Sequence, residues 1–174
     1  MPPGAAANAG SARRPGCGRG AATYRRGVGG HPYYYYVPYE PDLQAALDKL
    51  RAREFSAGRY HPAMPFIDFG EPALFAQGGG ARHRTIDEAL QDSGEIGTRS
   101  ILDIDRISDE PDFCAAAPVE GEALDDLYGT TRPTRDMLGG LDFLDGIERG
   151  QAVYLVVYRD GTPDQILFAG YSVD

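Results

Sequence analysis

The sequence predicts an α+β fold, in which a mostly antiparallel sheet with a C-terminal β-hairpin is packed by three to four helices. The C-terminal segment QAVYLVVYRDGTPDQILFAGYSVD contains two β-forming runs, at 152–159 and 165–173, joined by the turn sequence DGTPD. The run VYLVVY is apolar on both faces, which is typical of a central strand. Upstream, helical and strand-like segments follow one another without the regular βα alternation of a parallel sheet.

The first predicted strand, residues 33–40, contains a run of four tyrosines. Alternation along a strand places Tyr33 and Tyr35 on one face and Tyr34 and Tyr36 on the other. We expect one face to belong to the core and the other to be partly exposed or covered by a loop. A platform that stacks nucleic-acid bases is the alternative, but such platforms usually lie in basic grooves.

Apolar residues at helical spacing predict a helix in PDLQAALDKLRAREF, which begins near Pro41 and ends at Gly58. The segment 59–83 is predicted to be a long surface loop, because it holds three prolines, a Gly-Gly-Gly run and no clean period. Thr85 and Glu88 then form a capping-box pattern for a short helix.

Three more elements are predicted before the hairpin. Residues 98–108 alternate loosely as a strand, and residues 118–129 form a short helix. A longer helix is predicted from Thr131 to Gly150, because an apolar stripe follows start signals at its beginning.

Residues 1–30 are predicted to be a disordered tail, and residues 31–174 a single acidic domain. Half of the tail is glycine or alanine, and it contains five arginines and no acid. Such a segment buries too little apolar surface to offset the entropy of ordering. An arginine-rich arm that binds nucleic acid is one alternative, and a true translation start at Val28 is another.

Composition limits the class of protein. Residues 31–174 carry a net charge of −14, which repels nucleic acid and anionic membranes and attracts basic proteins. No apolar run reaches the roughly 18 residues that span a bilayer. Sixteen arginines against one lysine indicate translation from GC-rich bacterial DNA. Cys17 and Cys114 make no disulfide framework, which favours the cytoplasm, and Cys114 is expected to be a small buried thiol.

The ends of the long loop carry the candidate catalytic residues. Arg59, Tyr60 and His61 open the loop, and an Arg-His-Arg triplet at 82–84 closes it. If the loop ends converge, these residues form a cluster suited to anion binding or to acid–base catalysis.

Asp103 and Asp105 are candidates for a metal pair or for acid–base work, because a strand places both carboxylates on the same side. Their surroundings match neither a calcium-binding loop nor a phosphate-binding loop. We therefore expect a solvated strand face, no metal and no cofactor.

The segment 103–126 contains nine acids and one arginine. Apolar and aromatic residues lie among the carboxylates, a mixture suited to binding a basic protein. The predicted binding residues are Asp109, Glu110, Asp112, Glu122, Asp125, Asp126 and Tyr128.

These features predict a small cytoplasmic bacterial protein that binds a basic protein without catalysis, in the manner of an immunity protein or an antitoxin. Nucleic acid is not expected to bind the folded domain, nor is a membrane, and the oligomeric state is left open. One alternative is a small enzyme at the Arg59–His61 loop or at Asp103 and Asp105. Another is a structural or regulatory domain whose acidity serves solubility.

Overall fold

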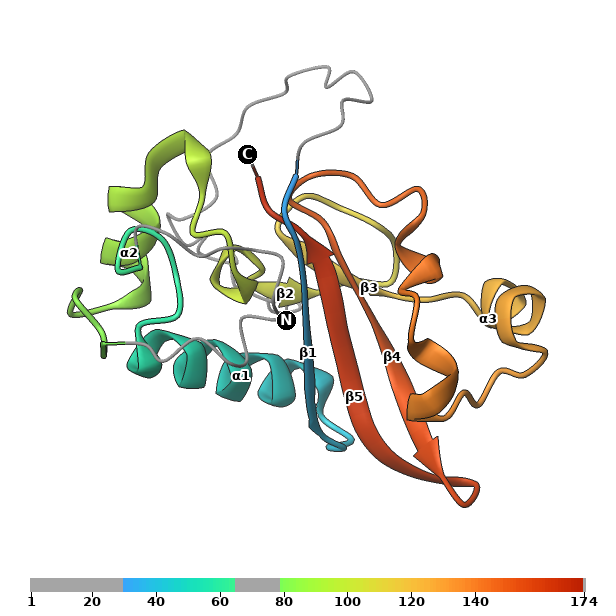
Figure 1. The fold of residues 1–174 in the computed structure, drawn as a ribbon. Coiled ribbons are helices and arrows are strands. Elements are labelled where there is room, and N and C mark those ends of the chain that lie inside the picture. The colour runs from blue at the N-terminus through green and yellow to red at the C-terminus, as the bar shows by residue number, and fades with distance from the viewer. Residues whose placement is uncertain (1–29, 65–78, 174) are drawn as a thin grey trace, which may run out of the picture.

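The computed structural model describes residues 30–64 and 79–173, which form a five-stranded sheet with helices on both faces (Figure 1). This mixed content agrees with the predicted fold class. The strands are β1 (Pro32–Pro38), β2 (Arg106–Ile107), β3 (Ala115–Pro118), β4 (Ala152–Arg159) and β5 (Thr162–Tyr171). The α-helices are α1 (Leu43–Ala57), α2 (Ile86–Ser93) and α3 (Gly121–Tyr128). Short 3₁₀-helices are η2 (Gly94–Ile96), η3 (Ile101–Asp103), η4 (Arg135–Leu138) and η5 (Asp142–Leu144).

The strand order in the described part of the chain is β1-β5-β4-β3-β2. β5 is antiparallel to β1 and β4, whereas β3 is parallel to β4, and β2 is parallel to β3. The sheet is therefore mixed, and the prediction of a mostly antiparallel sheet is not confirmed. β3 and β4 are parallel because the chain between them crosses one face of the sheet through α3, η4 and η5 (Figure 1).

The C-terminal hairpin is confirmed, but its turn has two residues in place of the predicted five, because β5 begins at Thr162. β4 and β5 pair along their length, and the turn residues Asp160 and Gly161 have φ values of 51° and 76°. Two consecutive positive φ values are what a tight type I′ hairpin turn requires. β4 is also the central strand of the sheet, as predicted from its two apolar faces.

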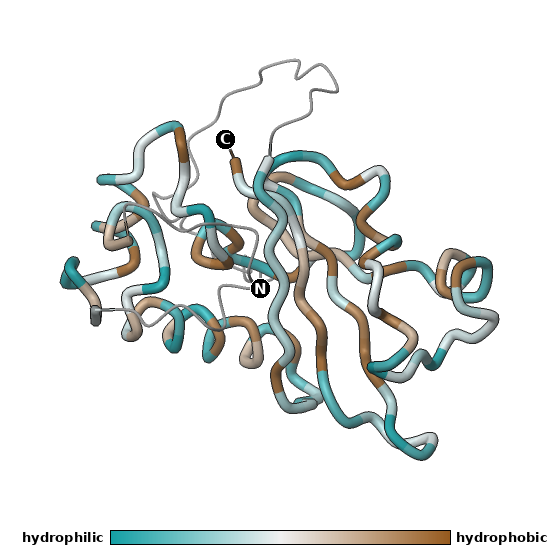
Figure 2. The backbone as a smooth tube through the Cα atoms, in the orientation of Figure 1, coloured by the Kyte–Doolittle hydropathy of each residue, from teal (hydrophilic) through white to brown (hydrophobic). Residues whose placement is uncertain are grey.

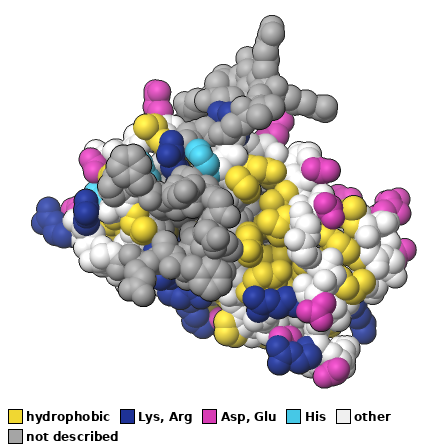
Figure 3. Space-filling view, viewed as in Figure 1, with side chains coloured by type: hydrophobic (Ala, Val, Ile, Leu, Met, Phe, Trp, Pro, Cys, Tyr) yellow, Lys and Arg dark blue, Asp and Glu magenta, His cyan; other side chains and the backbone are white. Residues whose placement is uncertain are grey.

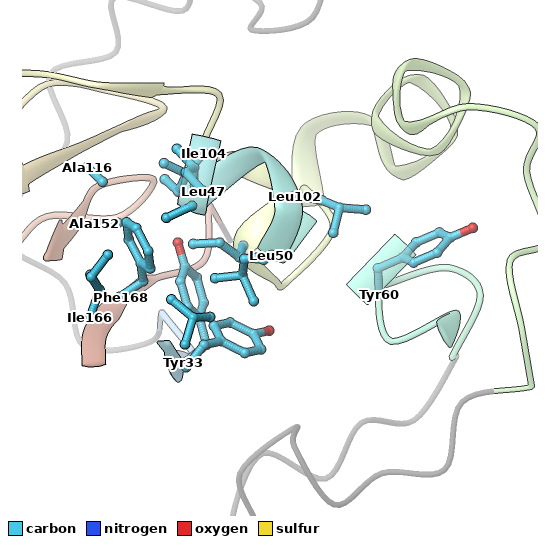
Figure 4. Packing of buried hydrophobic residues seen from close by; sticks show 14 of the residues in the cluster. Tyr33, Leu47, Leu50, Tyr60, Leu102, Ile104, Ala116, Ala152, Ile166 and Phe168 are labelled. Carbon is cyan, nitrogen blue, oxygen red and sulfur yellow. The ribbon is translucent and has the colours of Figure 1, made fainter. Parts of the chain in front are cut away.

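One core lies between the sheet and α1. The helix begins after Asp42, whose side chain accepts a hydrogen bond from the Ala45 N–H at 3.0 Å. Leu47 and Leu50 then share a buried cluster with Phe168 of β5 (Figure 4). Burial of this apolar face is what holds α1 against the sheet.

The tyrosine run divides between the two faces of β1, as predicted. Tyr33 and Tyr35 are buried in the core beside α1, whereas Tyr34 and Tyr36 are half-buried on the opposite face. Tyr33 lies among aliphatic side chains in Figure 4. The inner pair is therefore structural, and only the outer pair can take part in surface recognition.

A second core lies on the opposite face of the sheet, beneath α3, η4 and η5. Leu155 and Val157 of β4 pack there, together with Leu167 of β5. The cluster is completed from the covering elements by Leu124, Leu138, Phe143 and Leu144. Hydrophobic residues accordingly run along the middle of β4 and β5 (Figure 2).

The predicted strand at 98–108 is wrong. This segment contains η3 and only the two-residue strand β2. The Thr98 hydroxyl lies 2.7 Å from Oδ1 of Asp103 and 3.0 Å from the Ser100 hydroxyl. Such local side-chain bonds compete with a β-ladder, and they fold the segment into a turn.

The predicted long helix from Thr131 to Gly150 is also wrong, because the segment forms only η4 and η5. Gly139 and Gly140 follow η4 directly, and Leu141 has a positive φ of 53°. Glycine is a poor helix former, so the pair ends the helix before it can extend.

The two short helices are confirmed as α2 and α3, and the Thr85 hydroxyl caps α2 by accepting the Glu88 N–H at 3.1 Å. The predictions for the tail at 1–30 and for the middle of the loop at 59–83 lie almost wholly outside the described residues. Within the described ranges, no helix is both long and apolar enough to cross a membrane.

Cys114 lies directly before β3, where it is buried and disulfide-bonded. The expectation of a free thiol at this position is therefore wrong. Cys17 lies outside the described residues.

Tyr33 provides a test of the inner tyrosine face. Burial, followed by the charge of Asp103, raises the pKa of Tyr33, and its hydroxyl finds no hydrogen-bond partner among the described residues. Replacing Tyr33 with Phe should therefore leave the free energy of unfolding unchanged or raise it by about 1 kcal/mol. Tyr33→Ser should lower it by about 3–5 kcal/mol through the cavity that it creates.

Urea unfolding of both variants measures these changes, with Tyr34→Ser as the matched control on the half-buried face. The control should cost about 1 kcal/mol. Equal losses from the two serine variants would contradict the division of the faces.

Candidate functional site

The two ends of the long loop converge, as the sequence analysis required of this site. The Tyr60 hydroxyl lies 2.9 Å from Nδ1 of His83. Gly80 donates its N–H to the Ala57 carbonyl at 3.3 Å, and a Cβ placed on Gly58 would collide with the Gly80 carbonyl. Glycine at position 58 therefore allows the two backbones to approach closely, besides having the positive φ that ends α1.

The Tyr60 hydroxyl is fully satisfied. It accepts the backbone N–H groups of Arg82 at 3.2 Å and of His83 at 3.4 Å, so its own proton is directed to Nδ1 of His83. His83 then donates from Nε2 to Asp92 at 3.1 Å. The Tyr60 ring is wholly buried and stacks on Phe55 with centroids 5.5 Å apart. This chain of hydrogen bonds closes the loop.

Arg59 is engaged by a buried carboxylate. Its Nε and Nη2 atoms donate to the two oxygens of Glu54 at 2.6 and 2.7 Å, and the hydrogen bond to Glu54 raises the pKa of Arg59. Arg53 adds a third contact at 2.8 Å. Glu54 is wholly buried, and a buried carboxylate needs such charge-assisted partners. Two of the five N–H donors of Arg59 therefore serve the fold.

His61 is half-buried and lies beside the 98–104 turn, because its backbone N–H donates to the Thr98 carbonyl at 2.8 Å. The structure thus places Arg59, Tyr60 and His61 at one end of α1. Arg59 and Tyr60 have separate partners, Glu54 and His83. Asp92, the last member of the hydrogen-bonded chain, was missed from the sequence because it lies on α2.

Asp103 and Asp105 do not form a carboxylate pair. Asp103 is buried and accepts the Thr98 N–H at 2.8 Å, whereas Asp105 is exposed and pairs with Arg106 at 3.2 Å. The expected strand that would have aligned them is absent from the 98–105 segment. No group of three or more potential metal ligands is present in the described parts of the chain.

The predicted acidic interface separates into two places. Asp112 forms a salt bridge with Arg106 at 2.6 Å. The hydrogen bond from the backbone N–H of Phe113 lowers the pKa of Asp112, and the hydrogen bond from Arg106 lowers it further. Asp109 lies at the other end of β3, since the preceding Ser108 donates to the Ala116 carbonyl at 3.0 Å. α3 leaves the sheet from that same end, after Pro118.

The exposed carboxylates near α3 form one group, here called the acidic surface. Within residues 30–64 and 79–173, no salt bridge involves any of them. Acidic side chains accordingly lie along the edge of the molecule that carries α3 (Figure 3). The acidic surface consists of Glu120, Glu122, Asp125 and Asp126. Asp109 and Glu110 are not part of it, because they follow β2, whose Ile107 packs against the core beside α1.

Apolar groups border this surface. Leu124 is buried beneath α3, whereas Leu127 is 45% exposed and Met137 of η4 is 39% exposed. Burial raises the pKa of Tyr128, and the nearby Asp142 and Tyr36 raise it further. Tyr128 therefore lies between α3 and the outer tyrosine face. Met137 was missed from the sequence because it was assigned to the core stripe of a long helix.

The outer tyrosine face adjoins the same region. Tyr34 and Tyr36 meet edge to face with centroids 6.1 Å apart, and the Arg135 guanidinium lies 4.2 Å from the Tyr36 ring centroid. Hydrophobic side chains are visible over this part of the sheet in Figure 3. Both the carboxylates and the aromatic faces of this region can bind a cation.

Comparison with known proteins assigns no family to this arrangement. No protein-family model matches the chain, and neither the curated proteins nor the solved structures give a match.

The Glu54 contacts can be tested through stability. Glu54→Gln should lower the free energy of unfolding by about 3 kcal/mol, because it removes the charge that Arg59 and Arg53 surround. Tyr60→Phe should lower it by about 1–2 kcal/mol, since it leaves two partly buried N–H groups without their acceptor.

Urea unfolding provides both values. Glu88→Gln is the matched control, because it removes an exposed pair with Arg84 and should cost less than about 1 kcal/mol. A Glu54→Gln loss no larger than the control would refute a structural role for the buried carboxylate.

Proposed function

We propose that the protein is a non-catalytic binding module that engages a basic protein through the acidic surface. Leu127 and Tyr128 would supply the apolar anchors at its border. The likeness to an immunity protein or an antitoxin is one of charge, since such inhibitors cover basic toxins. A basic protein suits the surface better than nucleic acid, whose phosphates the carboxylates repel.

One observation supports this proposal above the others: the carboxylates of the acidic surface form no salt bridge in the described parts of the chain. Asp125 and Asp126 lie in the last turn of α3, which has no basic residue. Negative charge at that end opposes the helix dipole and costs roughly 0.3–1 kcal/mol per group. Asp125 and Asp126 therefore do not stabilise the helix, whereas they would stabilise a complex with a basic partner.

The alternative of an enzyme at the loop ends has less support. Arg59 is bound to Glu54, and the wholly buried Tyr60 hydroxyl already has its hydrogen-bond partners. A catalytic group needs a reacting atom within hydrogen-bond reach. The solubility alternative predicts no specific partner, so the following experiment separates it from binding.

Reversing Asp125 and Asp126 to Lys should abolish capture of a basic protein from a lysate of the native host. With the purified partner, association should slow at least tenfold at low salt, because steering by the acidic surface is lost. The thermal stability should stay the same or rise, since the two lysines complement the helix dipole. Surface plasmon resonance and thermal unfolding measure the two effects on one variant.

The matched control is Asp87→Lys with Glu95→Lys, which makes the same charge change on α2 and η2, across the sheet. This control should retain most of the association rate. Leu127→Ala should mainly speed dissociation, as truncation of an anchor does. Equal slowing by the two double reversals would show that overall charge, and not the acidic surface, attracts the partner.

We also propose that the protein acts in the cytoplasm. Disulfides rarely persist in that compartment, so the proposal requires the bond that Cys114 forms in the structure to be reduced inside the cell. Host cells are treated with an alkylating reagent, and the protein is then unfolded without reductant and examined by mass spectrometry. Cys114 should carry the alkyl group. Recovery of Cys114 in the oxidised form would place the protein in an oxidising compartment instead.

A further inference from the structure

A hollow of about 400 Å³ lies where the end of β1 turns into α1, on the opposite side of the sheet from the acidic surface. Its volume is within the range of small-molecule sites. The lining residues are Val37, Pro38, Tyr39, Glu40, Pro41, Ala46, Lys49, Leu50 and Arg53.

The floor of the hollow is apolar. Val37 from β1 and Ala46 and Leu50 from α1 are buried there, and the helical residues follow at a spacing of four, which places them on one face. Pro38 and Tyr39 add exposed apolar surface on the strand side. Such a floor favours a hydrocarbon chain or ring.

The rim carries two cations in a domain whose net charge is −14. Lys49, the one lysine of the chain, is 70% exposed. Arg53 uses its Nε for Glu54, and its Nη atoms have no hydrogen bond or salt bridge within the described ranges. Lys49 and Arg53 are four residues apart on α1, so both can reach one ligand.

Glu40 indicates what kind of anion fits the rim. Both of its carboxylate oxygens lie 2.7 Å from the Lys49 ammonium. The pair is exposed, and such pairs contribute little stability, so a second carboxylate can replace Glu40 at Lys49. An incoming carboxylate would also find the free Nη atoms of Arg53, which suit planar oxygen pairs.

We infer that this hollow binds a small organic carboxylate with an apolar body, held by its chain on the floor and by its charge between Lys49 and Arg53. The inference is independent of the protein partner proposed above, because the acidic surface lies across the sheet. The ligand class follows from the combination of an apolar floor with a cationic rim.

Titration of the full chain with octanoate, followed by two-dimensional amide NMR, tests the site. Saturable shifts are expected for Tyr39, Ala46 and Leu50. Octanol and acetate are the matched probes, since each lacks one of the two features. Each should bind at least tenfold more weakly than octanoate.

Four variants then test which charged side chains take part in octanoate binding. Arg53→Gln should weaken octanoate binding about tenfold, and the exposed Lys49→Gln about threefold. Glu40→Gln should strengthen it about threefold, because the competing carboxylate is removed. Arg84→Gln, a change at a 91% exposed arginine before α2, should have no effect.

Opposite effects at Glu40 and Lys49 are not expected of residues that only stabilise the fold. Octanol binding as tightly as octanoate would overturn the role of the rim. Equal affinities for all four variants, or no saturable shift around the hollow, would overturn the site itself.

Discussion

Burial of both faces of the β4–β5 hairpin is the constraint on which the rest of the structure depends. Ile166 and Phe168 of β5 enter the core beside α1, while Leu167 and Ala169 enter the core beneath α3. A strand pair with two apolar faces must be covered on both sides to fold in water. α1 and α3 are therefore held on opposite faces, and each keeps its polar side at the surface.

That arrangement also places positive and negative side chains on opposite sides of the sheet. The α1 side places Lys49 and Arg53 at a hollow, and it buries Glu54 between two guanidinium groups. The α3 side exposes carboxylates that form no salt bridge within the described chain, Asp125 and Asp126 included. The same sheet thus separates a rim that attracts anions from a surface that attracts cations, so that neither neutralises the other.

The sequence was sufficient where local chemistry and burial agree. The hairpin has a turn with the right glycine and alternating apolar strands, and the tyrosine run divides by strand alternation alone. Prediction failed where small polar groups or glycines override an apolar pattern: Thr98 and Asp103 fold a strand-like segment into a turn, and Gly139-Gly140 stops a helix. Site prediction failed for a different reason. The loop ends were identified, but partners such as Glu54 and Asp92 come from other elements, which spacing cannot reveal.

β1 is the element that the two proposed surfaces share. Val37 lines the hollow, while Tyr36 faces the opposite core beside Tyr128. β1 pairs with β5 from Pro32 to Pro38 without a register shift, and its inner side chains are buried in a packed core. Packed cores have low compressibility and resist small displacements. A ligand in the hollow can therefore change the acidic surface only by moving β1 as a unit against β5, which would break paired backbone hydrogen bonds. The two surfaces are accordingly expected to act independently, each with its own partner.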